Sequence, residues 1–300
     1  MATQSTCLRK LIVSVTGIAL LCLTSVSDGQ DRNGQLPQRL REPVFRVAKT
    51  PAPTADRAAN AHPLDPAIKV ARQCLVNIQA NVKDYTCTLV KRERINGKLG
   101  DYEYMYTKIR NQRVANGKVV IPLSAYMYFV KPASVAGREV VYVAGRNKGK
   151  LCAHEGGTKG RLIPSVWLAP NGVLAMKGQR YPLSEIGIEN LVAKLIERGL
   201  RDRTRNECEV EFRRGAKING RECTIIQVTH PHRRPYFDFH IARIFIDNEY
   251  NVPIRYAAFD WPKAAKAKPE VVEEYTYLNL KINVGLTDED FDTKNPKYNF

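Results

Sequence analysis

The residues with the clearest chemical potential lie together between positions 230 and 240. His230, His232, Asp238 and His240 combine imidazole and carboxylate groups, which zinc and iron accept as ligands. However, prolines interrupt the segment, and the adjacent arginine pair 233–234 would repel a cation. We therefore predict a structural or surface role for these residues, and no metal site.

Other signals for catalysis are weak. The sequence has no Gly-x-Ser-x-Gly motif, no evident pair of acids spaced as in a glycosidase, and no glycine-rich phosphate loop that opens a helix. His154 and Glu155 precede a glycine pair, but no partner set accompanies them. We predict that the protein is not an enzyme and uses no cofactor. An unrecognised hydrolase remains an alternative.

The histidine cluster lies within an antiparallel meander. Cys223–Thr229, His240–Asp247 and Val252–Asp260 are runs of β-branched and aromatic residues separated by turn residues, which is typical of three successive strands. Asn96-Gly97 is a strong hairpin signal between two earlier strands. Further strands are predicted at Ala125–Val130, Glu139–Val143, Lys150–Ala153, Leu162–Leu168 and Val271–Ile282.

Two amphipathic helices interrupt the strands. The first begins at Asp65-Pro66, and apolar residues recur at three- and four-residue spacing through Val82. The second has Ser184 as a plausible N-cap and Gly199 as the predicted terminator. Long runs of strands with only two such helices indicate an α+β domain.

The second half of the chain resembles a known superfamily. Phe245-Ile246-Asp247, the turn and strand Asn251–Arg255 and the closing phrase Asn283–Phe291 follow one another as in LolA/LolB-like proteins, the bacterial periplasmic lipoprotein carriers and their relatives. Within that superfamily the chain is similar to an uncharacterised bacterial family known only as a domain of unknown function. The resemblance covers about residues 66–291.

This resemblance implies a strongly curved antiparallel sheet, a LolA-like half-barrel, with the two helices on its concave face. Its relatives bind acyl chains or lipoproteins, or sense the state of the envelope. Phe129, Leu278 and Leu280 are then candidates to line an apolar groove, if the helices do not fill the concave side. In the last strand Leu278 and Leu280 are two residues apart, so we expect them to share a face.

The N-terminus predicts export. Arg9 and Lys10 precede an apolar run of thirteen residues, Leu11–Leu23, and small residues follow at Ser25-Val26-Ser27. Residues 1–27 therefore have the form of a signal peptide. A transmembrane anchor is the alternative, but it needs roughly 20 apolar residues. Residues 28–64 are Pro- and Arg-containing and are predicted to be a disordered linker. Residues 65–300 form one predicted domain, located in the periplasm or cell envelope.

Five cysteines remain after removal of the signal peptide, so at least one thiol must stay unpaired within the chain. Cys208 and Cys223 flank strands of one hairpin and are the first candidates for a disulfide. A tight turn at Asn219-Gly220 would instead place Cys223 near Ala216, and both alternatives stay open.

The chain is strongly basic. Its formal charge is +17, which becomes +15 when Arg9 and Lys10 leave with the signal peptide. Such a balance favours anionic partners such as lipid headgroups, although a broadly solvated positive surface is the alternative. Nucleic acid is an unlikely partner for an exported chain without a recognisable nucleic-acid motif. We therefore predict an exported protein that binds a lipid or lipoprotein acyl chain in an apolar groove with a basic rim. A structural or sensory envelope protein without a small ligand is the alternative.

Overall fold

The computed structural model describes residues 62–264 and 266–300. The predicted signal peptide and nearly all of the predicted linker lie outside these residues. The domain boundaries at 65 and 300 therefore stay a prediction. Among the described residues, no helix combines the length and the apolar character that crossing a membrane requires.

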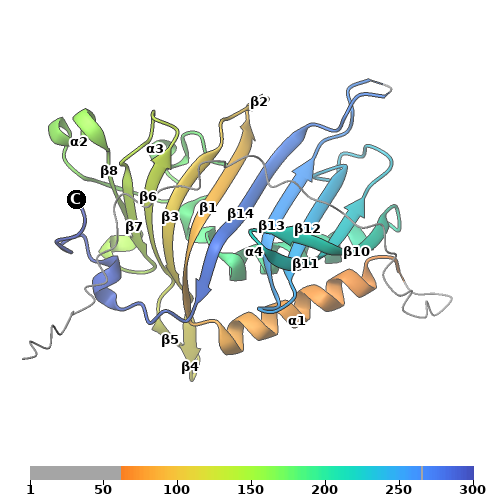
Figure 1. Cartoon of the computed structure of the whole chain (residues 1–300), viewed down its shortest axis with the longest axis horizontal. Coiled ribbons are helices and arrows are strands. Elements are labelled where there is room, and N and C mark those ends of the chain that lie inside the picture. Colours follow the sequence, from red (N-terminus) through yellow and green to blue (C-terminus); the bar gives the residue numbers. More distant parts are fainter. Residues whose placement is uncertain (1–61, 265) are drawn as a thin grey trace, which may run out of the picture. The chain divides into compact units, whose positions relative to one another are not determined.

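One large antiparallel sheet dominates the described part of the chain (Figure 1). Its strands run in the order β10-β11-β12-β13-β14-β1-β3-β6-β7-β8-β9, with β2 paired to β1, while β4 and β5 form a separate hairpin. The strands are β1 (Asp84–Ile95), β2 (Lys98–Leu99), β3 (Glu103–Arg110), β4 (Arg113–Ala115), β5 (Lys118–Ile121), β6 (Ser124–Lys131), β7 (Glu139–Val143), β8 (Leu151–His154), β9 (Val166–Leu168), β10 (Glu209–Ile218), β11 (Arg221–Thr229), β12 (Ile241–Asp247), β13 (Val252–Phe259) and β14 (Val271–Ile282). The predicted meander is confirmed as β11, β12 and β13.

Two long helices pack against one face of this sheet. The helices are α1 (Asp65–Asn81), α2 (Gly157–Leu162), α3 (Val173–Met176) and α4 (Ile188–Arg203), with 3₁₀ turns at Asn147–Gly149, Leu183–Glu185 and Asp288–Phe291. Helices α1 and α4 contact each other and both contact β13. The predicted α+β class is confirmed: the sheet is a curved, open half-barrel, and α1 and α4 cover its concave face.

Helix α4 differs from the prediction at both ends. It starts after Ser184, at Ile188, whose N–H donates to the Tyr85 hydroxyl of β1 at 2.9 Å. This cap comes from a distant strand, so local sequence could not reveal it. Gly199 does not end the helix, which continues to Arg203. A Cβ at Gly199 would lie 3.2 Å from Ile68 of α1, so the glycine allows close helix packing instead.

Strand β14 contains a bulge that overturns its predicted alternation. Its register with β1 shifts between Thr86 and Thr88, and Asn279 has a φ of 53°. One extra residue in a strand moves the following side chains to the other face. Leu280 therefore follows Tyr277 into the core, both 5% exposed, and does not share a face with Leu278.

Two further predictions are corrected. Leu162 ends the short helix α2, and only Val166–Leu168 of the predicted strand Leu162–Leu168 forms a strand. All five cysteines of the described residues are unbonded and buried. Cys223 pairs in register with Ala216, as the tight turn required, so it does not reach Cys208.

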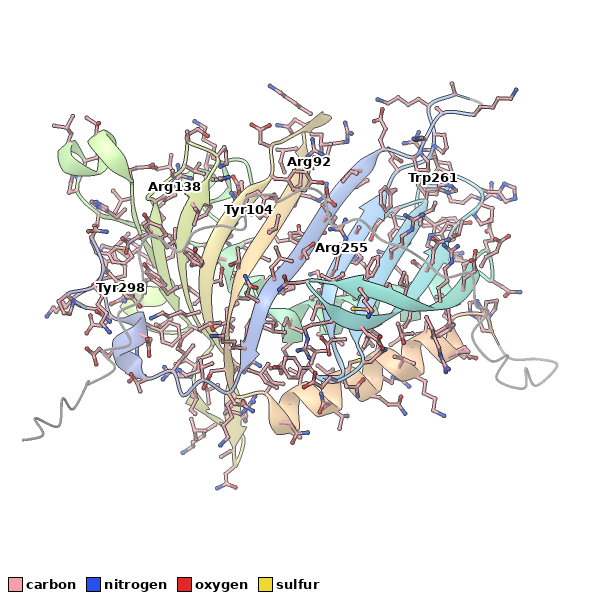
Figure 2. All side chains as sticks on the ribbon, in the orientation of Figure 1. Arg92, Tyr104, Arg138, Arg255, Trp261 and Tyr298 are labelled. Carbon is pink, nitrogen blue, oxygen red and sulfur yellow. The ribbon has the colours of Figure 1, made fainter. Side chains whose placement is uncertain are left out.

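The C-terminal segment covers part of the opposite face of the sheet. Tyr298 stacks on Tyr126 of β6 with ring centroids 4.0 Å apart. Tyr126, Val141 and Phe291 join Tyr298 in a second, smaller core cluster. Figure 2 shows Tyr298 at the β6–β7 side of the sheet and Trp261 at the other end, beyond β13.

Candidate ligand cavity and the charged network beside it

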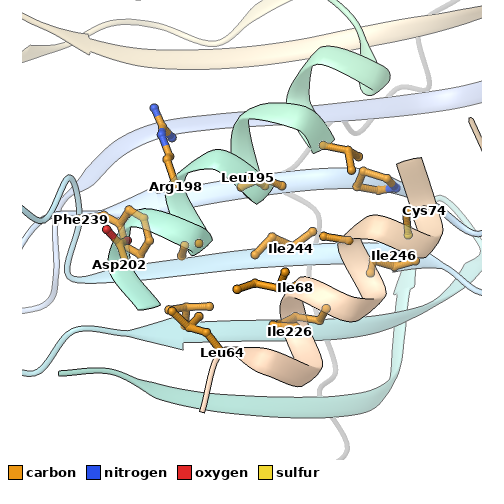
Figure 3. Close-up of a pocket in the computed structure, with 17 residues that line it drawn as sticks. Leu64, Ile68, Cys74, Leu195, Arg198, Asp202, Ile226, Phe239, Ile244 and Ile246 are labelled. Atoms are coloured by element: carbon orange, nitrogen blue, oxygen red, sulfur yellow. The ribbon is translucent and has the colours of Figure 1, made fainter. Parts of the chain in front are cut away.

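An apolar cavity of about 70 Å³ lies between α1, α4 and the sheet (Figure 3). Ile68 of α1 and Leu195 of α4 face Ile226 and Ile244 of the strands across it. Alternate residues of a strand point to the same face, so β11 and β12 each present a row of apolar side chains to the helices. The apolar faces of α1 and α4 form the other side of the cavity, so its lining is almost entirely apolar.

The cavity has one charged edge, formed by Arg198 and Asp202 of α4. The Arg198 side chain is 16% exposed and lies 3.5 Å from a Glu273 oxygen and 3.4 Å from an Asp238 oxygen. It also donates hydrogen bonds to the hydroxyls of Tyr181 at 2.7 Å and Tyr256 at 3.3 Å. The guanidinium is therefore already paired within the protein.

Arg198 connects the cavity to a buried charged network on the same face of the sheet. Glu273, 2% exposed, accepts hydrogen bonds from Arg180 and from Tyr181, each at 3.1 Å. Tyr275, which pairs in register with Tyr256, donates its hydroxyl proton to Glu93, and the same hydroxyl lies 3.3 Å from a Glu273 oxygen. Burial, together with these two carboxylates, raises the pKa of Tyr275. Its hydroxyl therefore stays protonated and acts as a donor.

The segment 179–181 covers this network and leads toward α4. Lys91 donates a short hydrogen bond to Gln179 and lies 3.2 Å from Glu103. The backbone N–H of Arg180 donates to Glu93 at 3.1 Å. Lys91 and Glu93 are 7% and 8% exposed. Buried charges are tolerated when they are paired and hydrogen-bonded, and this network meets that condition.

The sequence analysis missed this network. The pairs Lys91/Glu93 and Glu273/Tyr275 alternate along β1 and β14, a pattern that ordinarily indicates a solvated strand face. Their partners Arg180 and the α4 arginine lie far away in sequence. The only available signal was the density of acidic and aromatic residues in β14, which is adjacent to β1.

His230 does not line the cavity but lies behind its charged edge, beside Asp202, and is fully buried. Its Nδ1 lies 3.0 Å from the carbonyl oxygen of Phe239, its Nε2 lies 3.6 Å from an Asp202 oxygen, and its ring stacks on Phe237 at 3.8 Å. Burial lowers the pKa of His230 and raises the pKa of Asp202. Both directions favour the uncharged forms.

The other members of the histidine cluster do not gather around His230. His232 is exposed, and Asp238 is paired with Arg201 at 2.9 Å. His240 donates from Nδ1 to the His230 carbonyl oxygen at 2.9 Å, and its ring lies 5.7 Å from that of Trp261. Among the described residues, no three histidines, cysteines or acids are placed to hold a metal ion.

The three predicted groove residues do not line the cavity. Phe129 and Leu280 are buried in the main core, 5% exposed each, and Leu278 is partly buried against it. Their contact with a ligand stays a prediction.

His154 has a partner that the sequence did not indicate. Its Nδ1 lies 3.1 Å from the Ser165 hydroxyl. Glu155 points its carboxylate to Arg138 at 2.9 Å, and within the described ranges no carboxylate lies within 4 Å of the His154 ring. The pair therefore lacks the orienting acid of a catalytic triad. The buried thiols are poor nucleophiles, because burial raises the pKa of Cys74 and Cys152 to about 11.

Comparisons with known proteins give a family but only weak structural likenesses. No curated protein matches the chain. A DUF1329 family protein from Desulfovibrio piger is 13% identical with a TM-score of 0.36, covering 78% of this chain and 98% of its own. The lipoprotein LppX of Mycobacterium tuberculosis is 12% identical with a TM-score of 0.39, covering 76% and 100%. A LolA superfamily protein from Nitrosomonas europaea is 11% identical with a TM-score of 0.30, covering 74% and 97%.

These likenesses are too weak to carry a function to the present chain. The family match is extensive. Residues 82–300, most of the described part, match the model of DUF1571, a family described as proteins of unknown function. The chain belongs to the DUF1571 family.

Proposed function

We propose that this is an exported, non-enzymatic envelope protein that binds the acyl chain of a lipid or lipoprotein between α1, α4 and the concave face. The observation that carries the proposal is the apolar cavity beneath the two helices, with Arg198 at its edge. Apolar sites with few polar anchors are typical for ligands of this class. The LolA-like sequence pattern favours the same class of ligand.

Binding requires the helices to move. The cavity of about 70 Å³ is smaller than the ~150 Å³ that holds one benzene ring. Burial of an eight-carbon segment would contribute on the order of 6 kcal/mol, at ~0.8 kcal/mol per methylene. Near its C-terminal end, helix α1 is held by a few polar contacts. Asn77 donates to the carbonyl oxygens of Tyr250 and Asn251 at 3.0 and 3.3 Å, Gln79 donates to Glu189 at 3.2 Å, and the Asn81 carbonyl oxygen accepts from Asn283 at 2.7 Å. Displacement of α1 costs these bonds and some packing, so the ligand can drive it.

The first test fills the cavity. Ala71 lines it, whereas Ala80 on the same helix is exposed and does not. We expect Ala71→Leu to weaken binding of a fluorescent fatty acid about tenfold or more, because the added methylenes occupy ligand space. Ala80→Leu is the matched control and should bind as the wild type does. Failure of the delipidated, folded wild type to bind any fatty acid would contradict the proposal.

The second test locks the helix. Cys74 Sγ lies 3.8 Å from Asn251 Oδ1, so Asn251→Cys brings a second thiol beside it. Under oxidising conditions we expect a disulfide that fixes α1 to the β12–β13 turn and prevents uptake. A reductant should restore binding in the same sample. Uptake by the oxidised, disulfide-bonded variant at the wild-type level would show that α1 does not move.

The basic rim is tested separately. Attraction of an anionic headgroup to exposed charges should weaken with salt, since screening acts over ~8 Å at physiological ionic strength. We expect an anionic phospholipid to bind less well at high salt, and a neutral acyl probe to bind equally well. If salt changes the binding of neither probe, the proposed basic rim is wrong, while the proposed cavity is unaffected.

Hydrolysis is a second candidate function, favoured by the His154–Ser165 contact at 3.1 Å. It predicts turnover of an activated ester that Ser165→Ala abolishes. Equal rates for the variant and the wild type would exclude Ser165 as a nucleophile.

A further inference from the structure

The connection between β8 and α4 exposes an unusual number of large apolar side chains. Val173, Leu162 and Leu174 are 89%, 79% and 71% exposed. Three more large apolar residues of the same stretch are 42–46% exposed: Ile163, Val166 and Trp167. We call residues 162–174 the apolar loop. Soluble proteins rarely leave so many large apolar side chains of one short stretch open to water, and large exposed apolar patches mark interaction sites.

The apolar loop is attached to the sheet on both sides. Seven residues before it, Glu155 is held by Arg138 at 2.9 Å, and β9 within the loop pairs with β8. Beyond it, Arg180 is held by Glu273 at 3.1 Å. Both ends are thus anchored to the sheet, while the side chains between them project outward. Figure 1 shows α2 and α3 on the β6–β8 side of the sheet, away from α1.

The charge of this stretch identifies its partner. Residues 156–179 include Lys159, Arg161 and Lys177 and contain no acidic residue. Basic residues near an anionic bilayer are attracted to its surface. Trp167 adds an amphipathic ring of the kind that lies at the headgroup level. A stretch of exposed apolar residues with basic and no acidic residues beside them in the sequence fits a lipid surface with anionic headgroups.

We propose that the apolar loop docks the protein onto an anionic membrane surface, with Leu162, Val173 and Leu174 entering the outer part of the bilayer. The contact is peripheral. It does not depend on the acyl ligand proposed above, because the loop lies outside the cavity.

The structure provides a matched control. The hairpin β4–β5 also exposes apolar residues, with Val119 and Val120 55% and 58% exposed. It lies at the other end of the strands in Figure 1. If exposed apolar area alone caused membrane binding, the hairpin would contribute as much as the loop does.

The test is flotation of the exported protein with phosphatidylcholine vesicles, with and without phosphatidylglycerol. We expect binding only when phosphatidylglycerol is present, and a loss of about tenfold or more for Val173→Ser/Leu174→Ser. The substituted side chains are exposed, so the melting temperature should not change. Val119→Ser/Val120→Ser should bind as the wild type does. Loss of binding in the hairpin variant alone, or equal binding by all three proteins, would overturn the proposal.

Fluorescence gives an independent measurement. Trp167 and Trp261 are the two tryptophans of the chain, so Trp261→Phe leaves one reporter in the loop. We expect its emission to shift to shorter wavelength with phosphatidylglycerol vesicles. An unshifted spectrum would overturn the proposal. So would a concentration-dependent dimer that Val173→Ser/Leu174→Ser abolishes, because it would assign the loop to a second copy of the chain.

Discussion

The two halves of the concave face are covered by different kinds of contact. Over β11–β13 the cover consists of α1 and α4, and the contact is apolar with a cavity left inside. Over β14, β1 and β3 the segment 179–181 helps form the cover, and the contact is a network of paired charges. Apolar packing is non-directional, whereas charged hydrogen bonds need defined geometry. We therefore expect any rearrangement around the proposed ligand to occur in the apolar half, while the charged half holds α4 in place.

The largest effect is expected in the charged half. Glu273 is 2% exposed and neutralises Arg180 and Arg198. Glu273→Gln keeps the shape but removes the carboxylate that Arg180 contacts and leaves Arg198 with Asp238 alone. Breaking a buried pair in this way destabilises a protein by about 3–5 kcal/mol. Urea unfolding measures it.

The control for this substitution is an exposed pair. Lys217 and Glu222 lie 3.3 Å apart with side chains 62% and 65% exposed. Glu222→Gln should cost less than about 1 kcal/mol, because water screens the pair. Similar losses for the two variants would mean that the network is not a structural anchor, and the contrast between the halves would fail.

A substitution that enlarges the cavity tests the apolar half of the concave face. Ile226 is 3% exposed and lines the cavity. Ile226→Ala should cost about 2–5 kcal/mol, and the enlarged space should strengthen fatty-acid binding. Phe129→Ala removes a core side chain outside the cavity, and should cost about 3–5 kcal/mol without affecting the ligand. Altered fatty-acid binding in Phe129→Ala would instead favour the groove inferred from sequence.

Local patterns predicted most of the fold. Hairpin turns, strand alternation and amphipathic stripes placed the meander and both long helices, because these features depend on neighbouring residues. The errors lie where distant residues decide. The bulge at Asn279 moved Leu280 to the inner face, and contact with Ile68 turned the expected terminator Gly199 into a packing position.

The candidate site was predicted only as a class. An apolar space under two helices followed from the family resemblance, but its lining did not, because the cavity depends on how α1 and α4 cross. The charged network was invisible for a related reason. Arg180 and Glu273 become partners only when the chain brings β14 beside β1 and folds segment 179–181 over them.

The smallest effect concerns His230 and its neighbour Asp202, which lies at the charged edge of the cavity. Burial holds the pKa of His230 below its ordinary value of 6.5. The unfolded state then binds more protons as the pH falls below about 6.5, so this stabilising contribution is present above that pH and is lost as the pH falls through the lowered pKa. Asp202 acts in the opposite sense, because its raised pKa adds stability as the pH falls. We expect the wild-type melting temperature to decrease modestly from about pH 8 to about pH 5, and Asp202→Asn, which removes the opposing group, to steepen that decrease. His230→Gln should flatten the profile. Parallel profiles for the wild type and the His230→Gln variant would show that the pKa of His230 is the same in the folded and the unfolded state, which would contradict this prediction.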